Sequence, residues 1–240
     1  MMNAESITYE LDGLTMEGFI AVGDSSAQTQ PLVLIVHDWS GNRDFSQEKA
    51  RYFAKQGFVA FAVDLFGKGK RGSDTDRSLN EKLLNELLSN RPIVVPRLHA
   101  ALECAQSSAK IDPKKIMLIG FCMGGLCALD FARSGADIAG VVSVHGILNA
   151  MPNAPKNDIK AKILVLHGHE DKGVRPDDVV TFETEMTSRK ADWQVHTFGN
   201  TFHAFTNPKA NDKESGLVYN AAANARTWGL VRVFTDEIFA

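Results

Sequence analysis

A cysteine stands between two glycines in the segment G-F-C-M-G at residues 120–124. This spacing matches the G-x-S-x-G turn that carries a nucleophile between a strand and a helix, with sulfur in place of the serine oxygen. Glycines at these places let the strand and the helix approach each other, and the N-terminus of the helix favours a thiolate. We therefore interpret Cys122 as a nucleophile. The alternative is a small core residue, because free cysteine is among the most buried residue types.

A thiol nucleophile needs a base, and the base needs a carboxylate that orients it. In a site of this kind the chain order is nucleophile, acid, histidine. Asp171 ends the segment L-V-L-H-G-H-E-D, and His203 lies in the segment F-G-N-T-F-H-A-F. The order Cys122, Asp171, His203 therefore predicts a catalytic triad. Glu170 is an alternative acid, Asp171 could instead cap a turn or a helix, and His203 could be a packed core histidine.

Two backbone N–H groups would have to bind the oxyanion that forms during acyl transfer. The first is expected at Met123, directly after the nucleophile, and the second near Trp39, in the loop after L-V-L-I-V-H-D. Both assignments depend on position alone, because backbone donors have no side-chain signature. His145 ends another apolar run and is a candidate for binding substrate, with core packing as an equal alternative.

The elements that must hold these residues alternate along the chain. A hairpin is expected over 6–22, around Asp12-Gly13. Buried strands are expected over 31–38, 58–66, 115–121, 138–146, 161–171 and 193–199. Helices are expected over 46–58 with Gly57 as C-cap, 79–109 with breaks near Pro92 and Pro96, 123–135, 177–190 and 217–239. This order predicts one α/β domain over 1–240, with a mostly parallel sheet covered by helices on both faces.

Composition narrows the function classes. The formal net charge is -3, and basic residues are scattered, which argues against nucleic acid or an anionic membrane as a partner. No apolar run approaches the ~18 residues of a membrane span, and the first residues do not resemble a secretory signal. The three cysteines form no C-x-x-C pair and no metal-ligand spacing. We expect a cytoplasmic protein with free thiols, without metal or cofactor; its oligomeric state is not predicted.

Four segments together resemble the dienelactone hydrolase family of α/β-hydrolases: V-H-D-W-S-G-N at 36–42, G-F-C-M-G-G at 120–125, H-G-H-E-D at 167–171 and H-A-F at 203–205. The resemblance covers nearly the whole chain. It implies the α/β-hydrolase fold and a Cys-His-Asp triad that opens small esters or lactones through an acyl-enzyme. Acyl transfer or carbon–carbon bond hydrolysis on the same triad, and a non-catalytic binding protein of this fold, are the alternatives.

The chain departs from the family at three positions. Asp38 stands where well-studied members carry a longer glutamate that helps activate the thiol, so a helix cap is its alternative role. The resemblance implies two arginines that hold the substrate carboxylate, and this sequence has Lys68 and Asn207 at those positions. Lysine lacks the bidentate fork of arginine. We therefore expect substrates without that carboxylate, unless Arg71 or Arg97 supplies the charge.

Overall fold

The computed structural model describes residues 2–153 and 156–240. The chain forms two compact units, Met1–Leu118 and Ile119–Ala240. Their boundary falls within strand β5 (Ile111–Phe121), which contributes residues to both units. The single domain expected over 1–240 stays a prediction.

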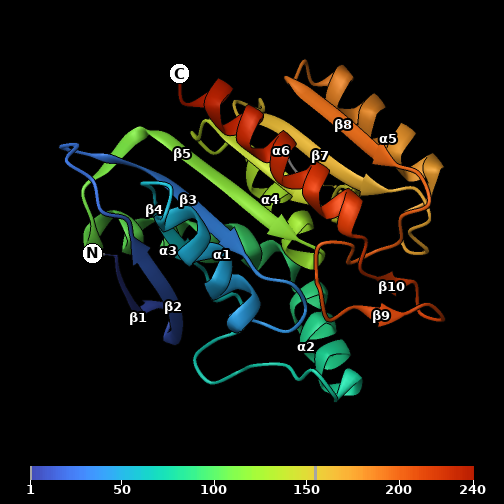
Figure 1. The fold of residues 1–240 in the computed structure, drawn as a ribbon, viewed down its shortest axis with the longest axis horizontal. Coiled ribbons are helices and arrows are strands. Elements are labelled where there is room, and N and C mark those ends of the chain that lie inside the picture. Colours follow the sequence, from blue (N-terminus) through green and yellow to red (C-terminus); the bar gives the residue numbers. More distant parts are fainter. Residues whose placement is uncertain (1, 154–155) are drawn as a thin grey trace. The chain divides into compact units, whose positions relative to one another are not determined.

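Eight strands follow the order β1-β2-β4-β3-β5-β6-β7-β8, with β5 as the strand common to both units (Figure 1). The first unit also contains β1 (Asn3–Leu11), β2 (Leu14–Val22), β3 (Gln30–Val36) and β4 (Val59–Ala62). The second contains β6 (Gly140–Val144), β7 (Lys162–Gly168) and β8 (Trp193–Phe198). β2 pairs antiparallel with β1 and β4, whereas the pairs β3–β4, β6–β7 and β7–β8 are parallel. The mostly parallel sheet is as the sequence predicts.

The predicted hairpin is confirmed. Leu11 pairs with Leu14, so Asp12 and Gly13 form a two-residue turn between the antiparallel strands. Both turn residues have positive φ angles, 49° and 78°. An aspartate followed by glycine tolerates this geometry, which matches the right-handed twist of the flanking strands.

The helices of the first unit are α1 (Asp44–Ala54), α2 (Arg77–Ser89) and α3 (Val94–Ser108), with a 3₁₀ turn at Arg91–Ile93. α1 packs on β2, β3 and β4, and α3 packs on β1. The break expected near Pro92 is present as the 3₁₀ turn. The break expected near Pro96 is wrong, because Pro96 lies in the first turn of α3, where a missing N–H removes no helical hydrogen bond. α1 also ends before Gly57, whose N–H donates to the Ala54 carbonyl.

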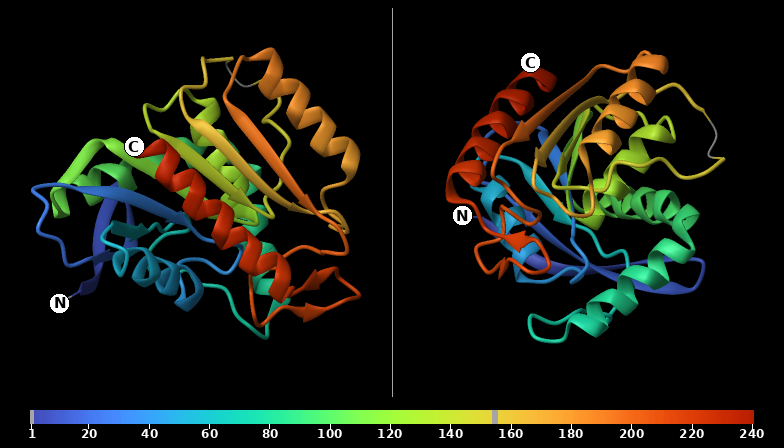
Figure 2. Two further views of the ribbon diagram at one scale, coloured as in Figure 1. Left: turned by 45° about the horizontal axis from the view of Figure 1, so that its top comes forward. Right: turned by 90° about the vertical axis from the view of Figure 1, so that its right-hand side faces the viewer.

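The helices of the second unit are α4 (Met123–Arg133), α5 (Pro176–Ser188) and α6 (Ala221–Ile238). α4 packs on β6, α6 packs on β6 and β7, and the two helices cover opposite faces of these strands (Figure 2). The start of α6 differs from the expected residue 217. Leu217–Val218 form a short strand, β10, paired with Asn211–Asp212 (β9), and the Asn220 side chain caps the helix by accepting the Ala223 N–H.

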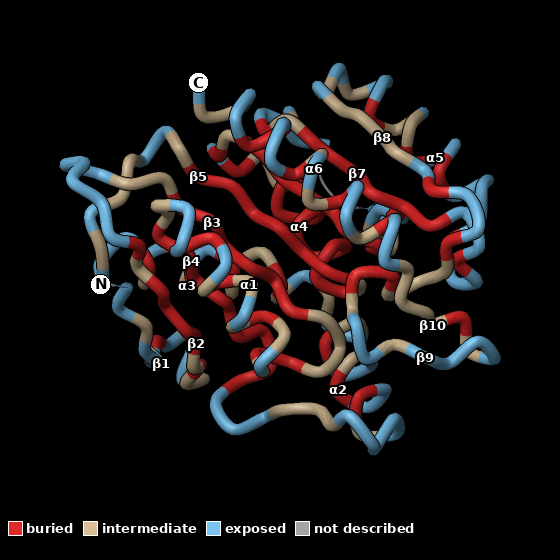
Figure 3. The backbone as a smooth tube through the Cα atoms, in the orientation of Figure 1, coloured by how far each residue is buried: buried red, intermediate tan, exposed pale blue. Residues whose placement is uncertain are grey.

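Buried residues run almost continuously along β3, β4, β6 and β7 (Figure 3). This burial explains their uninterrupted apolar sequences, since strands covered on both faces need no polar alternation. In the second unit, β5 ends at Phe121, β6 at Val144 and β7 at Gly168. Cys122, His145 and the Asp171 loop directly follow these strand ends. None of the helices in the described part of the chain has the length and apolar character needed to cross a bilayer.

Candidate active site

Cys122 occupies a strained turn between β5 and α4. Its φ and ψ are 54° and −119°, which L-residues rarely adopt. The glycines make this turn sterically possible: a Cβ atom on Gly120 would lie 2.0 Å from the Gly124 carbonyl oxygen. A Cβ atom on Gly125 would lie 2.6 Å from the hydroxyl oxygen of Ser143. The predicted strand-to-helix turn is confirmed, and Cys122 at its tip is partly exposed.

Met123 is the first residue of α4, and its side chain is fully buried. Its N–H has no acceptor within the helix, because the first four N–H groups of an α-helix lack intrahelical partners. An N–H without an intrahelical partner is free to donate to an oxyanion next to the thiol. The assignment of this donor remains a proposal.

Asp171 lies in the turn after β7, and its side chain is 1% exposed. Its Oδ2 atom is 2.6 Å from His203 Nδ1. Its Oδ1 atom accepts the backbone N–H groups of Gly173 at 2.8 Å and Val174 at 3.3 Å. Burial opposes ionisation of this carboxyl, but the hydrogen bonds and charge from His203 outweigh it and lower its pKa. Glu170 is exposed, so the geometry favours Asp171 as the partner of the histidine.

His203 lies in the loop after β8, which approaches the end of β7 closely. Gly168 permits this approach, because a Cβ atom there would lie 2.5 Å from the Thr201 carbonyl oxygen. The Glu170 N–H donates to the same carbonyl at 2.9 Å, and the Val218 N–H donates to the His203 carbonyl at 3.0 Å. These backbone contacts hold the imidazole over Asp171.

The pKa of His203 is raised to about 10. Burial acts to lower it, but the interaction with the charge of Cys122 and the hydrogen bonds to Asp171 and Cys122 outweigh the cost of burial. Because Nδ1 faces Asp171, Nε2 is the atom left to face the sulfur. Cys122, His203 and Asp171 are therefore brought together, with the imidazole between the sulfur and the carboxylate.

His145 has a different place from that expected of a substrate-binding residue. Its side chain is buried, with the residue 2% exposed, and both ring nitrogens are occupied by the protein. Nδ1 lies 3.2 Å from the Cys122 amide nitrogen, and Nε2 lies 2.9 Å from Thr206 Oγ1. Sequence reasoning missed Thr206, because a threonine three residues after a histidine carries no recognisable signal.

Asp38 and Trp39 belong to the first unit. The Asp38 carboxylate accepts the Ser40 N–H at 2.8 Å and the Ser40 hydroxyl at 2.6 Å. A helix cap is therefore wrong as its alternative role, since the N-cap position of α1 is Arg43. The Arg77 guanidinium lies 5.4 Å from the centre of the Trp39 ring. Thiol activation by Asp38 and oxyanion binding by the Trp39 N–H remain proposals.

Lys68 and Asn207 stand where the family resemblance implies two arginines, and together they provide little free positive charge. Lys68 Nζ lies 3.8 Å from Glu17 Oε1, and its side chain is 53% exposed. Asn207 is a turn residue whose Oδ1 accepts the Lys209 N–H at 3.0 Å, while its own N–H donates to the Ala204 carbonyl. Substrate binding by these side chains is untested.

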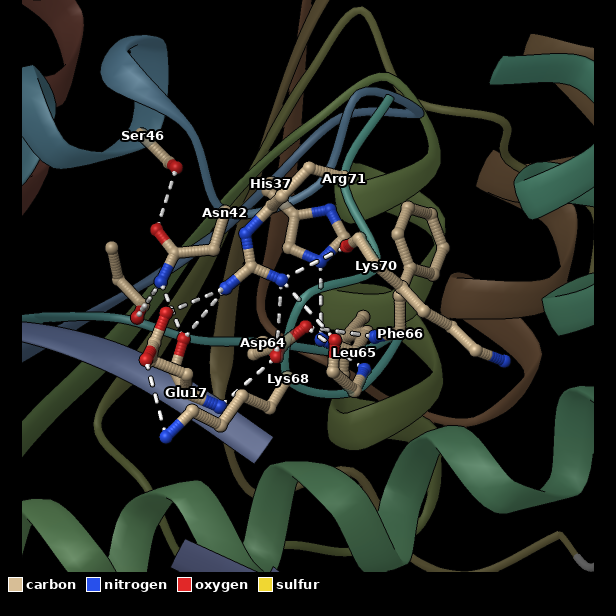
Figure 4. Close-up of polar contacts among 12 residues, drawn as sticks. Glu17, His37, Asn42, Ser46, Asp64, Leu65, Phe66, Lys68, Lys70 and Arg71 are labelled. Carbon is tan, nitrogen blue, oxygen red and sulfur yellow. Dashed lines mark hydrogen bonds and ion pairs between the residues drawn. The ribbon is translucent and has the colours of Figure 1, made fainter. Parts of the chain in front are cut away.

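A second polar cluster surrounds Asp64 in the first unit (Figure 4). Asp64 is fully buried and accepts hydrogen bonds from the backbone N–H groups of Glu17, Phe66 and Gly67. Arg71 completes the cluster, with its Nη1 atom 3.3 Å from Asp64 Oδ2. The Arg71 guanidinium also donates to the Glu17 carbonyl at 3.2 Å. Arg71 is thus engaged by neighbouring acidic and carbonyl groups.

His37 belongs to the same cluster and is structural. Its Nε2 atom accepts the Leu65 N–H at 3.1 Å, so the proton is on Nδ1, which donates to the Asp38 carbonyl at 2.6 Å. Burial lowers the pKa of His37, and the ring is neutral. It fixes the loop that contains Asp38 and Trp39 against the end of β4.

Arg97 lines a cavity of about 150 Å³ in the first unit, together with Phe66, Lys70, Leu83, Glu86, Leu87, Asn90 and Ile93. The Arg97 guanidinium donates to the Leu65 carbonyl. Lys70 Nζ lies 3.7 Å from Glu86 Oε2, so the cavity has no excess charge from this pair. Within residues 2–153 and 156–240, no group of three or more His, Cys, Asp or Glu side chains is arranged to hold a metal ion.

The sequence pattern of the dienelactone hydrolase family matches residues 16–239. An Aquifex aeolicus (strain VF5) protein, named as a candidate carboxymethylenebutenolidase, is 28% identical over 94% of this chain and 95% of its own. The solved structure m3DLH has a TM-score of 0.91 and 31% identity, over 100% of this chain and 99% of that one. A dienelactone hydrolase-like promiscuous phosphotriesterase from metagenomic libraries has a TM-score of 0.90 and 29% identity, over 99% and 98% of the two chains. These likenesses confirm the α/β-hydrolase fold, and the chain is a hydrolase that belongs to the dienelactone hydrolase family.

Proposed function

We propose that this chain hydrolyses small, neutral esters or lactones through Cys122, His203 and Asp171, with a thioester acyl-enzyme as intermediate. The observation that carries the proposal is the contact of His203 Nδ1 with Asp171 Oδ2 at 2.6 Å, in a histidine whose pKa the Cys122 charge helps to raise. A raised imidazole pKa favours a thiolate–imidazolium pair at rest. The thiolate is the nucleophilic form of cysteine.

In acylation, the Cys122 sulfur attacks the substrate carbonyl carbon and a carbon–sulfur bond forms. The carbonyl oxygen becomes an oxyanion, for which the Met123 N–H is the proposed first donor and the Trp39 N–H the proposed second. When the tetrahedral intermediate collapses, the carbon–oxygen bond to the leaving group breaks. The departing alkoxide takes the proton from His203 Nε2, while Nδ1–H stays hydrogen-bonded to Asp171.

In deacylation, neutral His203 removes a proton from water, and the resulting hydroxide attacks the thioester carbon. The carbon–sulfur bond breaks, which releases the carboxylic acid and restores the thiolate and imidazolium. Asp171 keeps the imidazole in one orientation through both steps, and its buried negative charge favours the cationic form of the ring.

Lys68 and Asn207, which stand where the family resemblance implies arginines, support the restriction to neutral substrates. Lys68 already faces Glu17, and Asn207 is neutral and engaged in a turn. A charge-assisted hydrogen bond contributes about 1.5–3 kcal/mol, so the missing charge lowers the affinity for a carboxylated lactone by roughly 10–150-fold.

A panel of neutral aryl esters, neutral lactones, a carboxylated lactone and a neutral phosphotriester tests this proposal. The phosphotriester is included because a structural neighbour at 29% identity is named a promiscuous phosphotriesterase. We expect turnover of neutral esters or lactones by the wild type and its loss in Cys122→Ala. A non-catalytic binding protein would turn over none of them, and an acyltransferase would need a second acyl acceptor for release. Full activity in Cys122→Ala would refute the proposed nucleophile.

A further inference from the structure

His145 connects the turn of the nucleophile to the loop of the base. It directly follows β6, and its φ of 40° places it in the left-handed region that non-glycine residues rarely adopt. Its N–H donates to the Leu166 carbonyl at 2.8 Å, which fixes this backbone conformation against β7. The strained backbone aims the imidazole beneath Cys122 rather than into solvent.

The hydrogen bonds define the protonation of His145. The Cys122 N–H is shared between the Val144 carbonyl at 3.1 Å and His145 Nδ1 at 3.2 Å, so Nδ1 must be an acceptor. The proton is therefore on Nε2, which donates to Thr206 Oγ1 at 2.9 Å. Burial, followed by the charge of His203, lowers the pKa of His145 well below its usual value. The ring is neutral, and both nitrogens are used.

The same ring also lies against the base. The ring centres of His145 and His203 are 5.0 Å apart, and Phe205 packs edge-on to His145 at 5.1 Å. Thr206 is in the loop that carries His203 and is 1% exposed, so its contact with His145 is sheltered from water. One neutral imidazole thus touches the Cys122 amide, the His203 ring and the His203 loop.

We propose that His145 and Thr206 are positioning residues of the triad, which set the distance between Cys122 and His203 without touching substrate. This inference rests on the proposed function, because it assigns the two residues to the thiolate–imidazolium pair. It replaces the substrate-binding role expected for His145. A misplacement of reacting groups by about 1 Å can lower turnover by ~10²-fold, so a residue of this kind acts on kcat rather than on KM.

Two pairs of variants separate positioning from packing. His145→Asn retains an acceptor near the Nδ1 position, whereas His145→Ala does not. Thr206→Val retains the shape of threonine without its hydroxyl, whereas Thr206→Ser retains the hydroxyl. We expect His145→Ala and Thr206→Val to lower kcat on a neutral aryl ester by roughly 10–100-fold with KM within about twofold. His145→Asn and Thr206→Ser recover part of this loss. His99→Asn, an exposed histidine of α3, is the control.

A second readout does not depend on ester hydrolysis. Iodoacetamide alkylates Cys122, and the rate at a series of pH values is measured by peptide mass spectrometry. This rate reports the fraction of Cys122 that is present as the thiolate stabilised by His203. The alkylation curve shifts to higher pH in His145→Ala and Thr206→Val and stays unchanged in His99→Asn. An increase in KM at unchanged kcat, or wild-type alkylation and kcat in Thr206→Val, would overturn the proposal. Hydrolysis by Cys122→Ala would instead refute the proposed function and leave the alkylation result to decide the role of His145.

Discussion

At the residue scale, the proposed chemistry depends on how Asp171 and Cys122 act together on His203. Asp171 contributes a buried charge and a 2.6 Å contact, and Cys122 contributes the charge on the opposite side of the ring. Each partner favours the protonated ring, although burial alone would lower the pKa of His203. The histidine is thus kept as an acid for the first step of the proposed reaction.

Replacing Asp171 with asparagine removes the charge that orients the ring. We expect Asp171→Asn to lower kcat by about 10²–10⁴-fold, because the imidazole loses its preferred tautomer and orientation. Glu170→Gln is the matched control, since this neighbouring carboxylate is exposed, and it should stay close to wild type. Steady-state kinetics on a neutral ester would contradict the assignment if the two variants ranked in the opposite order.

The raised pKa of His203 predicts the basic limb of the pH profile. The ring is protonated below a pKa of about 10, so kcat/KM for acylation should stay high through neutral pH and fall as pH rises past that value. Asp171→Asn removes one cause of the raised pKa, so its basic limb should move to lower pH. A wild-type limb near the ordinary histidine pKa of about 6.5 would contradict the thiolate–imidazolium pair.

At the scale of elements, the turn between β5 and α4 is the feature that the sequence predicted best. The reason is that its requirement is local: Gly120 must lack a side chain because Gly124 lies four residues away in the same turn. The contact of His145 with Thr206 could not be predicted, because it joins residues 61 positions apart. The Asp64 cluster was missed for the same reason, since Asp64 accepts the N–H of Glu17, 47 positions away. The start of α6 was misplaced because an apolar pair, Leu217–Val218, continues the helical pattern into a strand.

Gly120→Ala tests the turn directly. The added methyl group would lie 2.0 Å from the Gly124 carbonyl oxygen, so backbone atoms must move. We expect a loss of about 3 kcal/mol in the free energy of unfolding, which corresponds to a decrease in Tm of roughly 6–12 °C. Gly229→Ala is the control, because it lies within α6 with no atom near its Cβ position, and it should stabilise the protein by about 0.5–1 kcal/mol. Equal melting temperatures for Gly120→Ala and the wild type would show that the turn tolerates a side chain.

At the scale of the whole molecule, the formal net charge is -3. Two of the basic side chains that are candidates for binding substrate form ion pairs with acidic side chains. Lys68 and Arg71 both lie near Glu17, and Arg71 also contacts Asp64. The family resemblance predicted the reaction class, and we propose that the pairing of these cations limits which substrates this hydrolase accepts. No local pattern could have predicted the pairing, because Glu17 is far from both residues in sequence.

Asn207→Arg should restore one of the missing charges. We expect kcat/KM for a carboxylated lactone to rise by roughly 10-fold or more, whereas a neutral aryl ester should stay almost unchanged. Asn207→Gln, which adds length without charge, is the control. A wild-type enzyme that already prefers the carboxylated lactone strongly, with no gain from Asn207→Arg, would contradict the neutral-substrate assignment.

The most direct test of the central claim is the mass of the intact chain after reaction with a slowly deacylating activated ester. Acylation of Cys122 should add one acyl group, and peptide mapping should place it on Cys122 rather than on Cys104 or Cys127. The adduct should be absent in Cys122→Ala and should form more slowly in Asp171→Asn. Steady hydrolysis of the ester with an unmodified Cys122, or an adduct confined to Cys104 or Cys127, would contradict the account.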